Sequence, residues 1–373
     1  MYTSYFNLRE EPFRITSDPR FFHLAQPHAA ALTTLIEAVM RRKGFVVMTG
    51  PIGTGKTTVV HTTLQILSQS ANSHPISSAF ILNPMLTRDE FLEMVLAEFE
   101  VTCTATSKPA RLAALQRMLM NTQQKGGTSV LLVDEAHLLS PELLEEIRLI
   151  SNADTYKEKP LQIVLCGQPE LLPLLNRPEM RALKQRIAAS CLLRPLNLIE
   201  VRAYIQERMN AAGFRGTTDP FSGPIVEDIF RITQGVPRLV NLLCDACLEL
   251  SCKARCPIID LKIVDEAASE LGMKEMAVQQ ETAVPVDDHK GKDAPDNAVI
   301  GSALDVLIRA MKKRRSQSLD VQQTHGAFEA RQQIAAPSNR VNGQGAAGDP
   351  AIESAVDLLI QAMKLRRTST LEL

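Results

Sequence analysis

The sequence GFVVMTGPIGTGKTTV, residues 44–59, joins a short apolar run to a glycine-rich turn, a lysine and two threonines. Gly50, Gly55, Lys56 and Thr57 satisfy the pattern GxxxxGK[ST]. In this pattern the backbone N–H groups of the turn and of the following helix surround a phosphate, because both carry positive partial charge. The stretch therefore predicts a nucleotide-phosphate site.

The flanking sequence predicts that this turn lies between a strand at 45–49 and a helix at 55–70, which is the context that gives the pattern meaning. Other buried strands are expected at 79–82, 129–133 and 162–166, and helices at 29–42, 88–99, 109–124 and 141–152. Strands that alternate with helices predict an α/β fold with a parallel sheet covered on both faces. After Pro195 helices dominate to about residue 272, which predicts a smaller helical unit.

Each part of the predicted site has an expected role toward ATP and Mg²⁺. Lys56 is expected to reach the β- and γ-phosphate oxygens, and the Thr57 hydroxyl to be a ligand of Mg²⁺. The strand end SVLLVDEAH supplies Asp134 to hold the hydration shell of Mg²⁺ and Glu135 to orient and deprotonate the attacking water. The nucleotide is expected to contact the whole turn: Gly50, Pro51, Ile52, Gly53, Thr54, Gly55, Lys56, Thr57 and Thr58.

The letters DEAH are also typical of helicases. A helicase of that type would show a second RecA-like domain and a Ser-Ala-Thr motif, and the sequence shows neither. The helicase interpretation is therefore set aside.

Composition limits the class of protein. A chain of 373 residues is longer than one domain usually needs, and its 45% hydrophobic content supports a substantial core. The net charge of −1 provides no overall basic field for nucleic acid. The start MYTSYFNLREEPF has no leader-like apolar region, and no run of 18 apolar residues occurs. A cytoplasmic protein that does not span a membrane is expected.

The seven cysteines, an odd number, favour a reducing compartment over a disulfide framework. Four of them, between residues 244 and 256, have CxxC and CxxxC spacings that zinc sites also use. Leu239, Leu243, Cys247 and Leu250 recur at helical spacing, however, which favours Cys247 as a small core residue. Thiols are the favoured interpretation and a metal site is the alternative.

Several further motifs occur in one order along residues 2–272. They are YFNLREEPFRITSDPRFFHLAQPH, GPIGTGKTT, LLVDEAHLL, EEIRLISN, LQIVLCGQPEL, LKQRI and GVPRLVNLLCDACL. Together they resemble the ExeA/GspA/MshM group of AAA+ ATPases, which are associated with type II secretion and pilus biogenesis and related to TnsC/TniB-type transposition regulators. The resemblance implies an ATPase core over 1–197, a helical lid over 198–272, and nucleotide bound between adjacent subunits of a ring or filament.

The resemblance also implies roles for residues outside the phosphate turn. Gln168 occupies the sensor-1 position, and Arg238 in GVPR looks like the sensor-2 arginine of the lid. Arg186, in the context QRI, is favoured as the arginine finger that faces a neighbouring subunit, with Arg181 as the alternative. The DPRFF box, residues 18–22, is expected either near the adenine or in ordinary domain packing.

The tail after about residue 275 has a different composition. Segments 273–301 and 320–353 are rich in Gln, Pro, Asp, Gly and Ala, which predicts disordered linkers. SALDVLIRAMKKRRSQSLD aligns without gaps to SAVDLLIQAMKLRRTSTLE, and each copy has an apolar stripe followed by a basic cluster. The repeats predict amphipathic helices over 302–319 and 354–373 that dock on a protein partner, with an anionic membrane surface as the rival.

Two functions from different classes agree with these features. ExeA-type members often add a membrane span and a peptidoglycan-binding domain after the lid, and this chain departs from that pattern. The favoured function is an assembly or regulatory ATPase of secretion or pilus biogenesis. A partner could recruit such a cytoplasmic ATPase to the inner membrane face. The alternative is a DNA-loaded transposition-type regulator, weakly supported because segment 103–125 holds few basic residues. Intact Lys56 and Glu135 argue against a purely structural scaffold.

Overall fold

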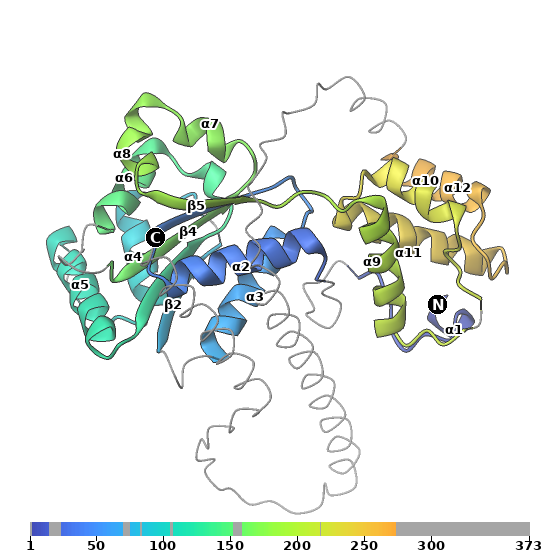
Figure 1. The fold of residues 1–373 in the computed structure, drawn as a ribbon, viewed down its shortest axis with the longest axis horizontal. Coiled ribbons are helices and arrows are strands. Elements are labelled where there is room, and N and C mark those ends of the chain that lie inside the picture. Colours follow the sequence, from blue (N-terminus) through green and yellow to red (C-terminus); the bar gives the residue numbers. More distant parts are fainter. Residues whose placement is uncertain are drawn as a thin grey trace, which may run out of the picture.

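The computed structural model describes residues 2–14, 24–69, 75–82, 84–104, 107–151, 159–216 and 218–273. These residues form a lobe built on a sheet and a lobe built of helices (Figure 1). The repeats predicted at 302–319 and 354–373, the linkers beside them and the 18–22 box lie outside the described residues.

The sheet has five parallel strands in the order β2-β3-β4-β1-β5. The strands are β1 (Phe45–Thr49), β2 (Ile76–Ile81), β3 (Thr128–Val133), β4 (Leu161–Gly167) and β5 (Ile187–Leu192). β1, β3 and β4 are buried along their whole length, as strands covered on both faces are. Because the strands are parallel, the loops after β1, β3 and β4 meet at one edge of the sheet.

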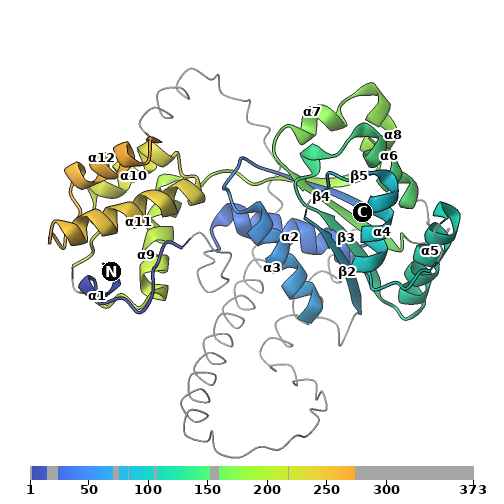
Figure 2. The ribbon, with the colours of Figure 1, turned by 180° about the vertical axis from the view of Figure 1, so that it is seen from behind.

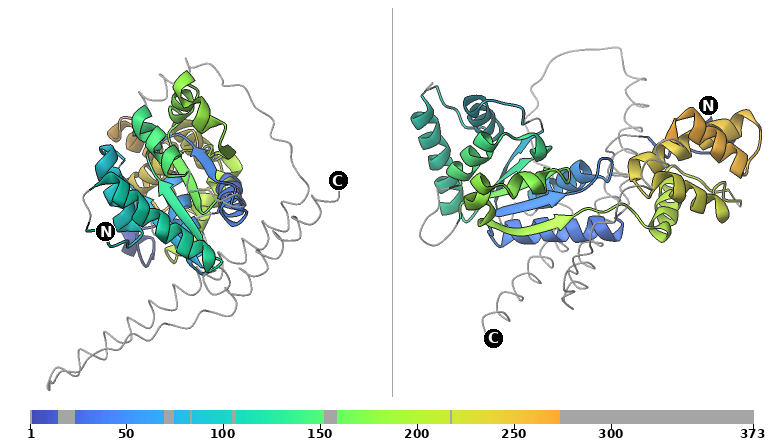
Figure 3. Two further views of the ribbon diagram at one scale, coloured as in Figure 1. Left: turned by 90° about the vertical axis from the view of Figure 1, so that its left-hand side faces the viewer. Right: turned by 90° about the horizontal axis from the view of Figure 1, so that it is seen from above.

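Helices cover both faces of this sheet (Figures 2 and 3). Val46 and Met48 of β1 pack in one apolar cluster, and Phe45 and Val47 pack in the other, because side chains alternate between the two faces of a strand. The first cluster contains α2 (Gln26–Met40) and α3 (Lys56–Gln69). The second contains α4 (Arg88–Glu98), α5 (Lys108–Gln124), α6 (Pro141–Ile150), α7 (Leu171–Leu175), α8 (Arg181–Lys184) and the short helices η3 (Ala136–Leu138) and η4 (Pro178–Met180).

Two elements, α2 and β2, begin three residues earlier than the sequence pattern predicts. α2 begins at Gln26 rather than at residue 29, because Pro27 fits the first turn of a helix, where no backbone N–H is needed. β2 begins at Ile76 rather than at residue 79. Of its first three residues, Ile76 and Ser77 are partly buried and Ser78 is exposed, because β2 is an edge strand, so they lack the apolar run that marks a buried strand.

The helical lobe contains α9 (Leu198–Ala211), α10 (Pro224–Thr233), α11 (Pro237–Lys253) and α12 (Leu261–Glu270). The short N-terminal helix α1 (Tyr2–Tyr5) also packs in this lobe. Cys247 lies on α11 and is fully buried in the core of this lobe, as its helical spacing predicts. Burial raises the pKa of the Cys247 thiol to about 12. Within the ranges that the structure covers, no helix is long and apolar enough to cross a membrane.

The N-terminal residues pack on the helical lobe, although the sequence analysis placed them with the ATPase core. Tyr2, Phe6 and Phe13 are buried in the cluster formed by α9 to α12. Arg208 of α9 is buried, and its Nε donates to the backbone oxygen of Pro12 at 2.6 Å. A buried guanidinium needs acceptors, and backbone oxygens of the N-terminal segment supply them, at Pro12 and at Arg14. The sheet lobe is therefore inserted between two parts of the helical lobe.

Candidate functional site

The phosphate loop, residues 50–55, joins the end of β1 to the start of α3. Gly53 and Gly55 have φ values of +79° and +95°, a region that side chains disfavour. At Gly50 an added Cβ would lie 2.5 Å from the backbone oxygen of Leu193, so only glycine fits there. The glycines predicted from the pattern are thus required by the shape of the loop.

Lys56 is the first residue of α3, and its side chain turns back into the phosphate loop. Its Nζ donates to the backbone oxygens of Gly50 at 2.9 Å and Pro51 at 3.0 Å, and the residue is only 6% exposed. The curve of the loop therefore encloses a cation beside the helix N-terminus. Both features favour an anion at this place.

Thr57 and Asp134 connect the phosphate loop to the end of β3. The Thr57 hydroxyl donates to Oδ2 of Asp134 at 2.7 Å, and the backbone N–H of Glu135 donates to Oδ1 at 2.9 Å. Asp134 is 1% exposed, so these bonds fix its carboxylate in one orientation. A hydroxyl and a carboxylate oxygen are hard donors that suit Mg²⁺, and these two residues fit that ion.

Glu135 begins the turn that follows β3. Its backbone is left-handed, with φ 48° and ψ 34°, a conformation that costs a non-glycine residue on the order of 1 kcal/mol. Its side chain is 39% exposed, and Oε2 lies 3.3 Å from Nδ1 of His137. The turn thus leaves the Glu135 side chain partly exposed, whereas Oε2, the oxygen that faces His137, is buried and has no hydrogen-bond partner among the residues that the structure describes.

Gln168 directly follows β4, so it lies at the same edge of the sheet as the phosphate loop and Glu135. Its backbone N–H donates to Nδ1 of His137 at 3.4 Å. His137 was absent from the predicted site. Its only sequence signal is its place in DEAH, two residues after Glu135.

The helical lobe reaches the phosphate loop through Arg238, near the start of α11. The backbone N–H of Arg238 donates to the backbone oxygen of Gly53 at 3.2 Å. An added Cβ on Gly53 would lie 2.8 Å from Cβ of Arg238, so the two backbones are closely packed. Arg238 is thus placed beside the phosphate loop, and the motif GVPR forms the junction between the lobes.

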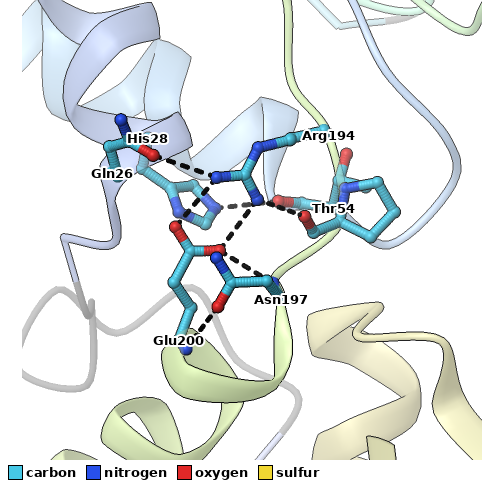
Figure 4. Close-up of polar contacts among 7 residues, drawn as sticks. Gln26, His28, Thr54, Arg194, Asn197 and Glu200 are labelled. Carbon is cyan, nitrogen blue, oxygen red and sulfur yellow. Dashed lines mark hydrogen bonds and ion pairs between the residues drawn. The ribbon is translucent and has the colours of Figure 1, made fainter. Parts of the chain in front are cut away.

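A second junction between the lobes surrounds the start of α9 (Figure 4). Arg194 forms a two-pronged ion pair with Glu200, with distances of 2.8 and 3.0 Å, and also donates to Oε1 of Gln26 on α2 at 3.0 Å. His28, two residues after Gln26 on α2, contacts the backbone oxygen of Thr54 through Nε2 at 2.9 Å. The junction thus joins α9, α2, the phosphate loop and the linker between β5 and α9, residues 193–197.

Sequence reasoning missed this second junction, although part of it has a sequence signal. Asn197 and Glu200 form a capping box at the start of α9, a pattern recognisable as Asn-x-x-Glu before a helix. Nothing local to Arg194 or Gln26 indicates that they pair, because 168 residues separate them.

Arg186 lies apart from the residues described above. It directly precedes β5, whose first residue pairs with Phe45 at the start of β1, whereas the phosphate loop follows the other end of β1. Its Nη1 donates to Oγ of Ser151 at 2.8 Å, and it lines a cavity of about 100 Å³ with Lys159. Arg181 begins α8 and is exposed. Within one chain, neither arginine is brought to the phosphate loop.

The parallel sheet, the phosphate loop and the acidic strand end define a P-loop protein of the AAA class. Residues 39–175 match the family described as AAA domain. General secretion pathway protein A of Aeromonas hydrophila is 39% identical over 250 residues, which are 66% of this chain and 44% of that protein. This confirms the resemblance drawn from the motifs, and the chain is an ExeA/GspA-like AAA protein. It spans less than half the length of that relative.

Solved structures similar to this chain share its fold at low sequence identity. The Aeropyrum pernix ORC2 protein is 15% identical, with a TM-score of 0.52 over 95% of this chain and 98% of that chain. Drosophila ORC bound to DNA is 16% identical, with a TM-score of 0.55 over 88% of this chain and 79% of that chain. Cdc6p from Pyrobaculum aerophilum is 15% identical, with a TM-score of 0.53 over 81% of this chain and 78% of that chain. These likenesses describe the fold alone.

Proposed function

We propose that this chain hydrolyses ATP and uses hydrolysis to drive assembly or rearrangement of a homo-oligomer. The observation that carries the proposal is the 2.7 Å contact between the Thr57 hydroxyl and Asp134. It joins the phosphate loop, which holds the Lys56 cation, to the strand end that presents Glu135. A phosphate-binding cation, oxygen donors for a metal and a carboxylate base then share one edge of the sheet.

The chain's own residues have separate roles in this proposal. Lys56 and the backbone N–H groups of the phosphate loop bind the β- and γ-phosphates. Thr57 and Asp134 hold Mg²⁺, which when bound supplies positive charge against the transferring phosphoryl group. Glu135 orients the attacking water and accepts its proton. Gln168 and Arg238 sense the nucleotide from β4 and from the helical lobe, and Arg186 acts in a neighbouring subunit.

The pathway is proposed from the relative and from the sequence of the tail. The name of the Aeromonas protein, at 39% identity, supports a role in secretion, and the alternative of pilus biogenesis rests on the motif resemblance. The repeats at 302–319 and 354–373 are proposed to be two docking helices for one protein partner, because each has an apolar stripe with a basic end. Two linked copies would gain avidity without new contacts.

Two substitutions test the proposed hydrolysis because they act at different steps. We expect Lys56→Ala to lose ATP binding, since it removes the cation of the phosphate loop. We expect Glu135→Gln to bind ATP but to lose turnover by about 100-fold or more, and to accumulate assembled protein. Nucleotide binding, phosphate release and sedimentation with ATP measure the three properties. Equal turnover by wild type and Glu135→Gln would reject the assignment.

The assembled Glu135→Gln protein also tests the pathway. A tagged form is purified with ATP and its bound partners are identified. Secretion or pilus components would support the proposed pathway. Recovery of DNA, with binding that weakens steeply as salt is raised, would instead support the DNA-loaded regulator.

A further inference from the structure

The turn after β3 brings one histidine against the carboxylate of Glu135. His137 lies on η3, its side chain is 11% exposed, and its Nδ1 is 3.3 Å from Oε2 of Glu135. The left-handed backbone of Glu135 produces this approach, because it reverses the chain between the strand and the short helix. The carboxylate and the ring are therefore held together by the same turn.

The end of β4 holds the other side of this arrangement. The backbone N–H of Gln168 points at Nδ1 of His137, at 3.4 Å. A Cβ on Gly167 would lie 3.0 Å from the backbone nitrogen of His137, so the glycine permits the close packing of strand and turn. The ring nitrogen thus lies between a donor from β4 and an acceptor from the turn after β3.

One ring nitrogen serves only one of these partners at a time. Nδ1 accepts from the Gln168 N–H when the ring proton is on Nε2, and it donates to Glu135 when it carries the proton itself. Both distances are longer than the 2.7–3.2 Å of most protein hydrogen bonds, as expected for an atom placed between two partners. The two contacts are therefore alternatives.

We propose that His137 is a positioning residue that sets the direction of the Glu135 carboxylate and links it to the end of β4. This inference rests on the proposed role of Glu135 in ATP hydrolysis. With the proton on Nδ1, His137 holds Oε2 of Glu135. With the Gln168 N–H on Nδ1, the carboxylate is released to face the attacking water. Movement of Gln168, the residue proposed to sense the γ-phosphate, then determines whether the carboxylate of Glu135, the proposed base, is held by His137 or free to reorient.

The kinetic test uses two replacements that differ in where their amide lies. An Asn side chain places a donor and an acceptor near the position of Nδ1, whereas a Gln side chain places them near Nε2. We expect His137→Ala and His137→Gln to lower kcat about 10-fold or more, with the Kd of ATP within about 2-fold of wild type, since misplaced catalytic groups cost rate rather than binding. His137→Asn should recover at least half of the lost activity. His61→Ala, at an exposed histidine on α3, is the control and should match wild type.

A double-mutant cycle tests whether His137 acts through Glu135. In the Glu135→Gln background, His137→Ala should have no further effect on the residual rate. An undiminished effect there, or full activity of His137→Ala, would overturn the inference while leaving the proposed function standing. Wild-type protein that does not turn over ATP in a Lys56-dependent manner would instead refute the proposed function.

A second readout needs no nucleotide. The ¹⁵N resonances of the His137 ring report which nitrogen carries the proton. We expect Glu135→Gln to shift the ring toward the form with the proton on Nε2, because the acceptor for Nδ1–H becomes weaker. Glu170→Gln, an exposed acid at the start of α7, is the charge-matched control and should leave the ring unchanged. Ring resonances that do not respond to Glu135→Gln would show that the pair does not interact.

Discussion

Gly235 shows how one residue brings the two lobes together. It has φ +69°, and an added Cβ would lie 1.8 Å from the backbone oxygen of Leu196 in the linker before α9. The backbone N–H of Leu196 donates to the oxygen of Gly235 at 2.9 Å. Arg238 follows three residues later and contacts the phosphate loop. The glycine of GVPR is thus required for the close approach that places this arginine.

Replacement of Gly235 by alanine should therefore destabilise the protein more than the same change at an open glycine. The left-handed backbone costs about 1–2 kcal/mol, and the forced shift of the Leu196 backbone about 1–3 kcal/mol more. Gly272→Ala is the control, because Gly272 has φ +66° but nothing within 4 Å of the added Cβ. Gly272→Ala should therefore lose only the stability that the left-handed backbone costs, about 1–2 kcal/mol. Urea unfolding measures both variants, and equal losses would contradict the argued contact.

At the scale of elements, the start of α9 holds the helical lobe against the sheet lobe. Burial alone would raise the pKa of Glu200, but hydrogen bonds from Arg194 and from the backbone N–H of Asn197 lower it below its usual value. The same Arg194 reaches α2 through Gln26, and α2 reaches the phosphate loop through His28 (Figure 4). A substitution at the start of α9 therefore alters contacts in both lobes.

Glu200→Gln tests this junction, because glutamine retains the capping box while losing the charge. The side chain of Arg194 is 41% exposed, so we expect Glu200→Gln to lower the free energy of unfolding by only about 1 kcal/mol at neutral pH. Since folding lowers the pKa of Glu200, its contribution is present above the unfolded pKa of about 4.3 and is lost as pH falls through the lower folded value.

The difference in unfolding free energy between wild type and Glu200→Gln should thus become smaller as the pH is lowered. Unfolding curves measured at neutral and acidic pH determine it. Glu227→Gln, in the first turn of α10 and exposed, is the control without this ion pair. A difference that grows in acid would contradict the assigned direction of the pKa shift.

At the scale of the whole molecule, the phosphate loop and Arg186 lie at opposite edges of the sheet. The five residues of β1 separate these edges by roughly 16 Å, at about 3.3 Å per residue. That distance is longer than an arginine side chain. A head-to-tail contact between two copies would bring the Arg186 edge of one to the phosphate loop of the next, and such contacts close into rings or extend as filaments.

Mixing two inactive variants tests this arrangement. Arg186→Ala keeps the phosphate loop, and Lys56→Ala keeps the arginine, so in an equal mixture about a quarter of random head-to-tail interfaces combine both intact parts. We expect recovery of up to about that share of wild-type turnover, measured as phosphate release against mixing ratio. Arg181→Ala is the matched control and should be active alone. No recovery with confirmed co-assembly would favour Arg181 or a monomeric enzyme.

The sequence alone determined the local features of this protein. The alternation of apolar runs with helical periodicity predicted the parallel sheet and its covering helices, because side-chain period is set by neighbours along the chain. The glycines of the phosphate loop and the acids Asp134 and Glu135 were likewise predicted, since turn geometry and strand ends depend on a few consecutive residues. The structure brings these predicted residues together at one sheet edge.

Only the tertiary structure decided which distant segments meet. It placed residues 2–14 on the helical lobe, paired Arg194 with Gln26, and set His137 between Glu135 and Gln168. Apart from the place of His137 in DEAH, no local pattern marks these contacts, because an arginine or histidine has the same neighbours in sequence whether or not a partner packs against it. Such pairs are selected by the burial of apolar surface and by the acceptors that a buried cation requires, and both are properties of the packed chain.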